Sequence, residues 1–152
     1  MYLITVLLLM FVLPVGMTWY DYQQATHPSL LFLVGKWFVF WSAGARLLIA
    51  GLWQFFQPQF TLTEIFGIKS REARPIVREL GATNLATGLV GLLSFYWPAF
   101  LVPVAIIAGI FYGVAGIEHA LRKNRSLNET VAMVSDLFVC AALAVFLVSR
   151  VI

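Results

Sequence analysis

The stretch SLLFLVGKWFVFWSAGARLLIAGLWQFF, residues 29–56, decides the fold class of this chain. A helix needs about 20 predominantly apolar residues to cross the hydrocarbon core of a bilayer, and this stretch exceeds that length. Two cations, Lys36 and Arg46, interrupt it. Because a charge inside a membrane is expensive, ionisable residues in such spans commonly mark functional sites. The stretch therefore predicts a membrane-spanning helix and directs the search for a site to its two charges.

The composition extends the membrane interpretation to the whole chain. Of the 152 residues, 61% are hydrophobic and 11% are charged, and the mean hydropathy is +0.90. The apolar residues are spread over nearly the whole length, which indicates one polytopic unit. The formal net charge of +3 comes from basic loops too sparse for a nucleic-acid patch. We therefore expect a lipid bilayer as partner and no nucleic acid.

We predict an all-α polytopic transmembrane bundle of about five spans, forming a single domain over residues 1–152. Trp97-Pro98 separates two apolar stretches, because proline removes a backbone donor and breaks a helix. The first stretch lacks the basic region and cleavage pattern of a signal peptide, so a retained helix is expected. The predicted spans are residues 1–20, 29–56, 75–96, 99–121 and 127–152, with a cytoplasmic loop at 57–74.

The distribution of Lys and Arg predicts the orientation. Two connections hold loop cations, whereas Tyr20 to Pro28 and Trp97-Pro98 hold none. By the positive-inside rule the two basic connections are cytoplasmic, which places the N-terminus inside and the C-terminus outside. The basic residues are Lys69, Arg71 and Arg74 after the second span, and Arg122, Lys123 and Arg125 after the fourth.

Two patterns predict helix starts in the loops. Ser126-Leu-Asn-Glu129 is a capping-box pattern directly before an apolar run. This gives Glu129 a structural role. Thr61-Leu-Thr-Glu64 repeats the pattern and predicts one short helical turn at the cytoplasmic interface.

Small residues predict which helices touch. Helices in a bilayer associate through close packing, which favours glycine on the contacting faces. We expect the second, third and fourth spans to form a compact centre through these faces. A homodimer groove at Gly109-x-x-x-Gly113 is the alternative use of the fourth span. The packing glycines are Gly109 and Gly113 on the fourth span, Gly81 and Gly88 on the third, and Gly44 and Gly51 on the second.

Buried polar residues predict a site in the cytoplasmic half. Arg46 lies about 15 Å before the end of its span at Phe56, and Asn84 and Asp136 fall at overlapping depths of about 9 to 14 Å. We expect Arg46 and Asp136 to form a salt bridge between the second and fifth spans. Lys36 lies near the outer end of its span and can extend to the headgroups. The predicted polar cluster is Arg46, Glu79, Asn84, Glu118, His119 and Asp136.

The chemistry of the cluster admits few cofactors. Glu79, Glu118, His119 and Asp136 are ligand types used by Zn, Mn or Fe, but no His-x-x-x-His or Glu-x-x-His pattern supports a metal, and His27 falls on the other side of the membrane. Neither a Gly-x-Ser-x-Gly elbow nor a phosphate-binding loop occurs in the sequence. We predict no catalytic residue, no metal and no cofactor.

Three runs carry a family resemblance. They are Gly35-Lys-Trp-Phe-Val-Phe-Trp41, Arg78-Glu-Leu-Gly-Ala-Thr-Asn-Leu85 and Gly109-Ile-Phe-Tyr-Gly113. The chain resembles a family of small bacterial integral membrane proteins of unknown function, loosely similar to DoxX-like membrane proteins. The resemblance implies a location in the bacterial inner membrane and singles out Glu79, Asn84, His119 and Asp136.

Three functions remain open from the sequence. The first is a non-enzymatic bundle whose polar cluster binds or relays a small polar species or a proton. The second is an accessory subunit, or a homo-oligomer, that contacts partner helices through its glycine-rich and aromatic faces. The third is a membrane enzyme that handles a lipid or quinone at the cluster.

Overall fold

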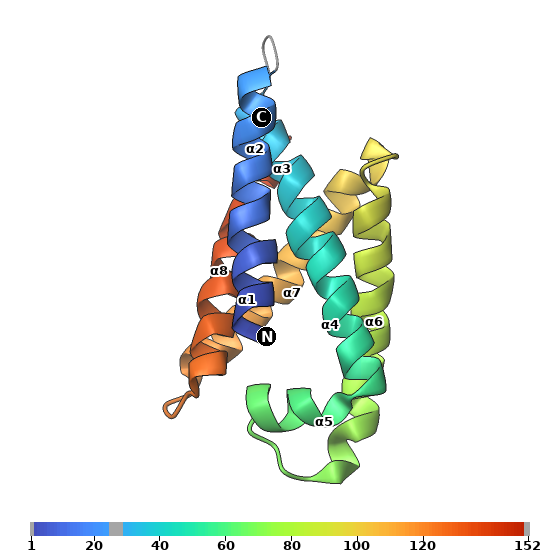
Figure 1. Ribbon diagram of the computed structural model, residues 1–152, viewed down its shortest axis with the longest axis vertical. Helices are drawn as coiled ribbons and strands as arrows, with labels where there is room; N and C mark the ends of the chain where they lie inside the picture. The colour runs from blue at the N-terminus through green and yellow to red at the C-terminus, as the bar shows by residue number, and fades with distance from the viewer. Residues whose placement is uncertain (1, 25–28, 151–152) are drawn as a thin grey trace.

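The computed structural model describes residues 2–24 and 29–150. Within these ranges the chain forms helices and no strand, which confirms the predicted all-α bundle. Figure 1 shows long helical rods running side by side along the vertical axis, with short helices crossing the lower end. This architecture suits a bilayer, because a helix satisfies its backbone hydrogen-bonding groups within itself.

The rods are built from consecutive helical segments. The first rod is α1 (Tyr2–Leu7), η1 (Leu8–Val12) and α2 (Leu13–Gln24), and the second is α3 (Leu30–Phe38), η2 (Val39–Ala45) and α4 (Arg46–Phe56). Short helices follow: α5 (Pro58–Phe60), η3 (Thr61–Ile65) and η4 (Arg71–Ala73). The remaining rods are α6 (Arg74–Leu93), η5 (Pro98–Phe100) with α7 (Leu101–Leu121), and α8 (Leu127–Val148).

Four of these rods are long and apolar enough to cross a membrane. Within the described residues they are Tyr2–Gln24, Leu30–Phe56, Pro98–Leu121 and Leu127–Val148. The chain is therefore a membrane protein by the length and composition of its helices. The third predicted span, α6, is not among the four; its sequence includes Arg74, Arg78 and Glu79. The fifth span stays a prediction, supported by the position of α6 alongside α4 (Figure 1).

The two basic connections lie at the same end of the bundle. Figure 1 shows the α5–α6 and α7–α8 connections at the lower end, and the connection from α6 to η5 at the upper end. The basic segments thus share one membrane side if the rods span. Which compartment that end faces stays a prediction from the positive-inside rule. α5 and η3 lie beneath the start of α1, where the Tyr2 and Phe60 rings are 6.2 Å apart.

The start of α8 confirms the predicted capping box. The Ser126 side chain accepts a hydrogen bond from the Glu129 backbone, and the Glu129 carboxylate accepts one from the Ser126 backbone. The second predicted box, at Thr61, is wrong in detail. The helical turn begins earlier, at Pro58 with Gln57 before it, so Thr61 lies inside the turn. Proline suits the first turn because the N–H that it lacks has no helical partner there.

Glycines bring α6 and the second rod into backbone contact. A Cβ added at Gly51 would lie 2.6 Å from the Leu85 nitrogen, and one at Gly91 would lie 2.7 Å from the Gly44 Cα. A Cβ at Gly88 would collide with the Leu48 backbone. The contact thus continues over several turns of both helices, at the distance that only glycine permits.

The glycines of α7 contact a different helix from the ones that the sequence predicted. A Cβ at Gly113 would meet Cys140 Sγ at 3.1 Å, and one at Gly116 would meet Leu137 at 2.7 Å. Gly109 lies near Leu143, with 3.9 Å between its added Cβ and the leucine Cβ. All three neighbours belong to α8, so this face packs on the fifth predicted span instead of joining a centre with α4 and α6.

Two π-helical segments meet where the first two rods cross. Ser42 in η2 donates a hydrogen bond to the Leu9 carbonyl in η1 over 3.2 Å, and Tyr112 of α7 donates to the Ser42 carbonyl over 2.5 Å. π segments interrupt the regular α-helical ladder and commonly accompany functional sites. This chain of bonds ties three rods together one turn before Arg46, the first residue of α4.

Candidate functional site

Arg46 occupies the interior side of α4 directly after the η2 segment. Its side chain is half-buried, and its Nε is buried without a hydrogen-bond partner. The guanidinium carbon lies 5.7 Å from the centre of the Tyr2 ring. The Arg46 charge also acts electrostatically on Tyr112 and Asp136. We call Tyr2, Arg46, Tyr112 and Asp136 the Arg46 site; its members come from α1, α4, α7 and α8.

The expected salt bridge between Arg46 and Asp136 is not formed. Within the described ranges the ion pairs are Lys36–Asp21 and Arg122–Glu129. The two charges of the Arg46 site act on each other without direct contact. The depth argument put both charges at one level, but depth alone does not fix how far apart two helices hold them. The site therefore contains a separated cation and carboxyl group in a largely apolar bundle.

Asn84 belongs to a different interface. It is 2% exposed, and its amide nitrogen donates to Gln54 Oε1 over 2.7 Å. Gln54 lies on α4 and Asn84 on α6, in the same interface as the packing glycines Gly51 and Gly81. This bond satisfies a buried amide at the α4–α6 interface, and it is separate from the Arg46 site.

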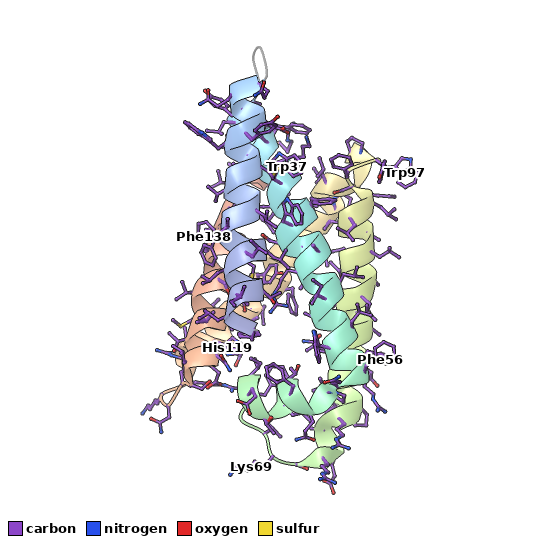
Figure 2. All side chains as sticks on the ribbon, in the orientation of Figure 1. Trp37, Phe56, Lys69, Trp97, His119 and Phe138 are labelled. Atoms are coloured by element: carbon purple, nitrogen blue, oxygen red, sulfur yellow. The ribbon has the colours of Figure 1, made fainter. Side chains whose placement is uncertain are left out.

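His119 lies at the lower end of α7 (Figure 2), where α8 and the η3 turn also meet. The side chain is 6% exposed, and Nδ1 is buried without a hydrogen-bond partner. Nearby, Arg122 forms an ion pair with Glu129 and donates to the Phe66 carbonyl over 2.9 Å. Arg125 donates to the carbonyls of His119 and Ala120. Arg125 thus satisfies carbonyls at the end of α7, and Arg122 joins this end to the η3 turn.

The other two predicted members do not join a common cluster. Glu79 and Glu118 both have exposed side chains, on α6 and α7 respectively. Helical periodicity explains the outcome, because a residue next to a buried one points about 100° away around the helix. Thus His119 is buried while Glu118, one position earlier, is not. The six predicted residues divide among the Arg46 site, the Asn84–Gln54 contact, the His119 end and two exposed positions.

Asp21 was not among the predicted site residues, but its carboxylate contacts two side chains of α3. Lys36 Nζ lies 2.7 Å from Asp21 Oδ2, and Trp37 Nε1 donates to the same oxygen over 3.0 Å. Lys36 Nζ also lies 4.3 Å from the centre of the Trp37 ring. The sequence held one indication of this ion pair. Asp21 is the lone acidic residue of the first predicted connection, and Lys36 lies near the start of the span that follows this connection.

Metal binding has no geometric support in the described part of the chain. No group of three or more His, Cys, Asp or Glu side chains converges there. His119 and Glu129 approach each other, but Glu129 is engaged by Arg122 and by the Ser126 backbone. His27 lies outside the described residues. Among the described residues, the buried side-chain nitrogens without a hydrogen-bond partner are Trp41 Nε1, Arg46 Nε and His119 Nδ1. The first two are N–H donors and suit a hydrogen-bond acceptor or an anion, whereas Nδ1 of a neutral imidazole is a donor in one tautomer and an acceptor in the other.

Comparisons with known proteins identify a family. Residues 2–151 match the sequence model of a family of unknown function, DUF6790. No curated protein and no solved structure matches the chain. The looser likeness to DoxX-like proteins stays a prediction.

Proposed function

The chain belongs to the DUF6790 family of unknown function, and we propose that it is a non-enzymatic protein of the bacterial inner membrane whose Arg46 site binds or relays a small polar species or a proton. The observation that carries the proposal is the buried Nε of Arg46, which has no hydrogen-bond partner. A buried donor without a partner costs about 1 to 3 kcal/mol. A bundle that retains such a group in an apolar interior has a use for it.

The separation of Arg46 from Asp136 supports the same proposal. A direct ion pair would neutralise both groups and leave little for a ligand to bind. A small molecule that accepts a hydrogen bond from Arg46 and donates one to Asp136 satisfies both groups at once. For a proton, Asp136 is the carboxyl group that exchanges it. Tyr2 and Tyr112 add hydroxyl groups at the edge of the site.

Proton relay can be tested without knowing the identity of a ligand. The purified protein is placed in liposomes that contain a pH-sensitive dye, and a potassium gradient with valinomycin drives proton entry. We expect faster acidification than in empty liposomes, and loss of that excess in Asp136→Asn. Glu118→Gln is the matched control, because it removes an exposed carboxylate from the same half of the bundle. Equal rates in filled and empty liposomes refute the proton relay.

A second candidate is an accessory role in a larger membrane complex. The observation in its favour is the outer face of α6, where Ala82, Thr83 and Ala86 are exposed. Small and hydroxyl-bearing residues favour helix contacts in a bilayer, and α6 is not one of the four apolar rods. Gly81 and Gly88 are already enclosed by α4, so a partner helix would use the alanine and threonine face. Stable co-purification of other subunits in mild detergent would favour this role.

A further inference from the structure

An open pocket at the lower end of the bundle, called the cavity below, is distinct from the Arg46 site. It lies where α4 ends, α5 begins and α6 starts, and its volume is about 350 Å³. This is within the range of small-molecule pockets, about 300 to 1,000 Å³. Figure 2 shows Phe56 at this end, on the side of α6. The lining residues are Phe56, Gln57, Pro58, Gln59, Arg74 and Arg78.

The charge of this cavity is entirely positive. Arg74 and Arg78 are four residues apart on α6, so both guanidinium groups project from one face of that helix. None of the lining residues is acidic. Neither arginine takes part in the ion pairs of the described chain. The first turn of α6 adds the positive end of a helix dipole. The charge of the cavity therefore suits an anion.

One contact holds an arginine in a binding orientation. Arg74 Nε donates to Gln59 Oε1 over 3.0 Å, across the cavity from α6 to α5. This bond uses the inner nitrogen and leaves the two terminal nitrogens available. Paired terminal nitrogens of arginine match two oxygens of a phosphate group. Gln59 thus acts as a positioning residue for Arg74.

We propose that this cavity binds the phosphate group of an anionic glycerophospholipid. Its position favours a lipid over a soluble phosphate compound, because it lies at the end of a predicted membrane-spanning rod, where headgroups reside. Phe56, which lines it, is 71% exposed and offers an apolar surface to an acyl chain. Basic pockets between helices on the cytoplasmic side are a known mode of lipid headgroup recognition. The proposal is independent of the Arg46 site.

The test compares lipids retained by the full-length protein. Native mass spectrometry in detergent is performed with phosphatidylglycerol, with phosphatidylcholine and with inorganic phosphate as competitor. We expect retained phosphatidylglycerol, and about a tenfold loss of retention in Arg74→Gln/Arg78→Gln, because charge-assisted bonds to phosphate are lost. The matched control is Lys69→Gln/Arg71→Gln, which removes the same charge from exposed positions outside the cavity. It should retain the lipid as the unmodified protein does.

Three outcomes overturn the proposal. Equal losses in the site and control variants would mean general attraction to a basic surface. Equal retention of phosphatidylcholine would mean that the cavity does not select an anion. Displacement of the lipid by inorganic phosphate at millimolar concentration would mean a soluble phosphate ligand. If the double arginine variant fails to fold, Gln59→Leu replaces it: both charges remain, and we expect weaker retention because Arg74 loses its orientation.

Discussion

The two sides of the second rod, formed by α3, η2 and α4, differ in how they meet their neighbours. Towards α6, glycines bring the backbones together and Asn84 is bonded to Gln54. Towards α1 and α8, Arg46 Nε has no partner and Asp136 forms no ion pair. We call the α6 side closed, because backbone packing fills it, and the opposite side open, because Arg46 Nε has no partner and Asp136 no ion pair there. The contrast indicates that α6 anchors the rod, and it is the basis of our proposal that the open side binds a ligand.

The largest expected effect lies on the closed side. Gly88→Ala places a Cβ into the Leu48 backbone, and a backbone cannot rotate away as a side chain can. Overpacking typically costs about 1 to 3 kcal/mol, and we expect the upper end of that range. Unfolding in detergent, followed by circular dichroism during titration with a denaturing detergent, measures the loss.

The control for this change is Gly16→Ala in α2. A Cβ at Gly16 meets no atom within 4 Å, and alanine favours a helix by about 1 kcal/mol over glycine. We therefore expect no loss of stability from Gly16→Ala. If both variants lose equal stability, the α4–α6 contact does not depend on close glycine packing, and the contrast between the two sides disappears.

The second-largest expected effect concerns the hydrogen bond between α7 and η2 of the second rod. Tyr112→Phe removes the hydrogen bond to the Ser42 carbonyl while keeping the buried ring. We expect a loss of about 1.5 kcal/mol, near the upper limit for hydrogen bonds between membrane helices. The same unfolding titration measures it. The Arg46 site should also change, because η2 positions the start of α4. A neutral result would mean that η2 keeps its shape without α7.

The third prediction addresses Arg46 and Asp136 through a double-mutant cycle. A direct buried pair would lose about 3 to 5 kcal/mol when one partner is removed. Because the structure separates the two groups, we expect Arg46→Leu and Asp136→Leu each to cost less, with a coupling energy of about 1 kcal/mol between them. Coupling at the level of a broken buried pair would show that the two charges close on each other in the bilayer.

The sequence predicted the parts of the fold that depend on periodicity and composition. The apolar stretches located the rods, Trp97-Pro98 located a break, and Ser126 to Glu129 located the start of α8. It did not predict the π segments at Leu8–Val12, Val39–Ala45 and Thr61–Ile65, because an apolar stretch does not distinguish a π turn from a regular α-helical turn. The polar cluster was only partly predictable from the same patterns. Depth follows from counting residues, whereas the direction and separation of side chains follow from how helices rotate and pack.

The smallest expected effect returns to the closed side. Asn84 is almost fully buried, and its bond to Gln54 crosses the interface of α4 and α6. Burial alone would suggest a large cost for Asn84→Ala. However, hydrogen bonds between membrane helices contribute about 0.6 kcal/mol on average, since the separated helices find other partners. Gln54 is half-buried near the end of α4 and has that freedom. We therefore expect a loss of about 0.6 kcal/mol, well below that of Gly88→Ala. The reverse order in the same titration would mean that polar bonding, instead of close backbone contact, holds α6 against the second rod.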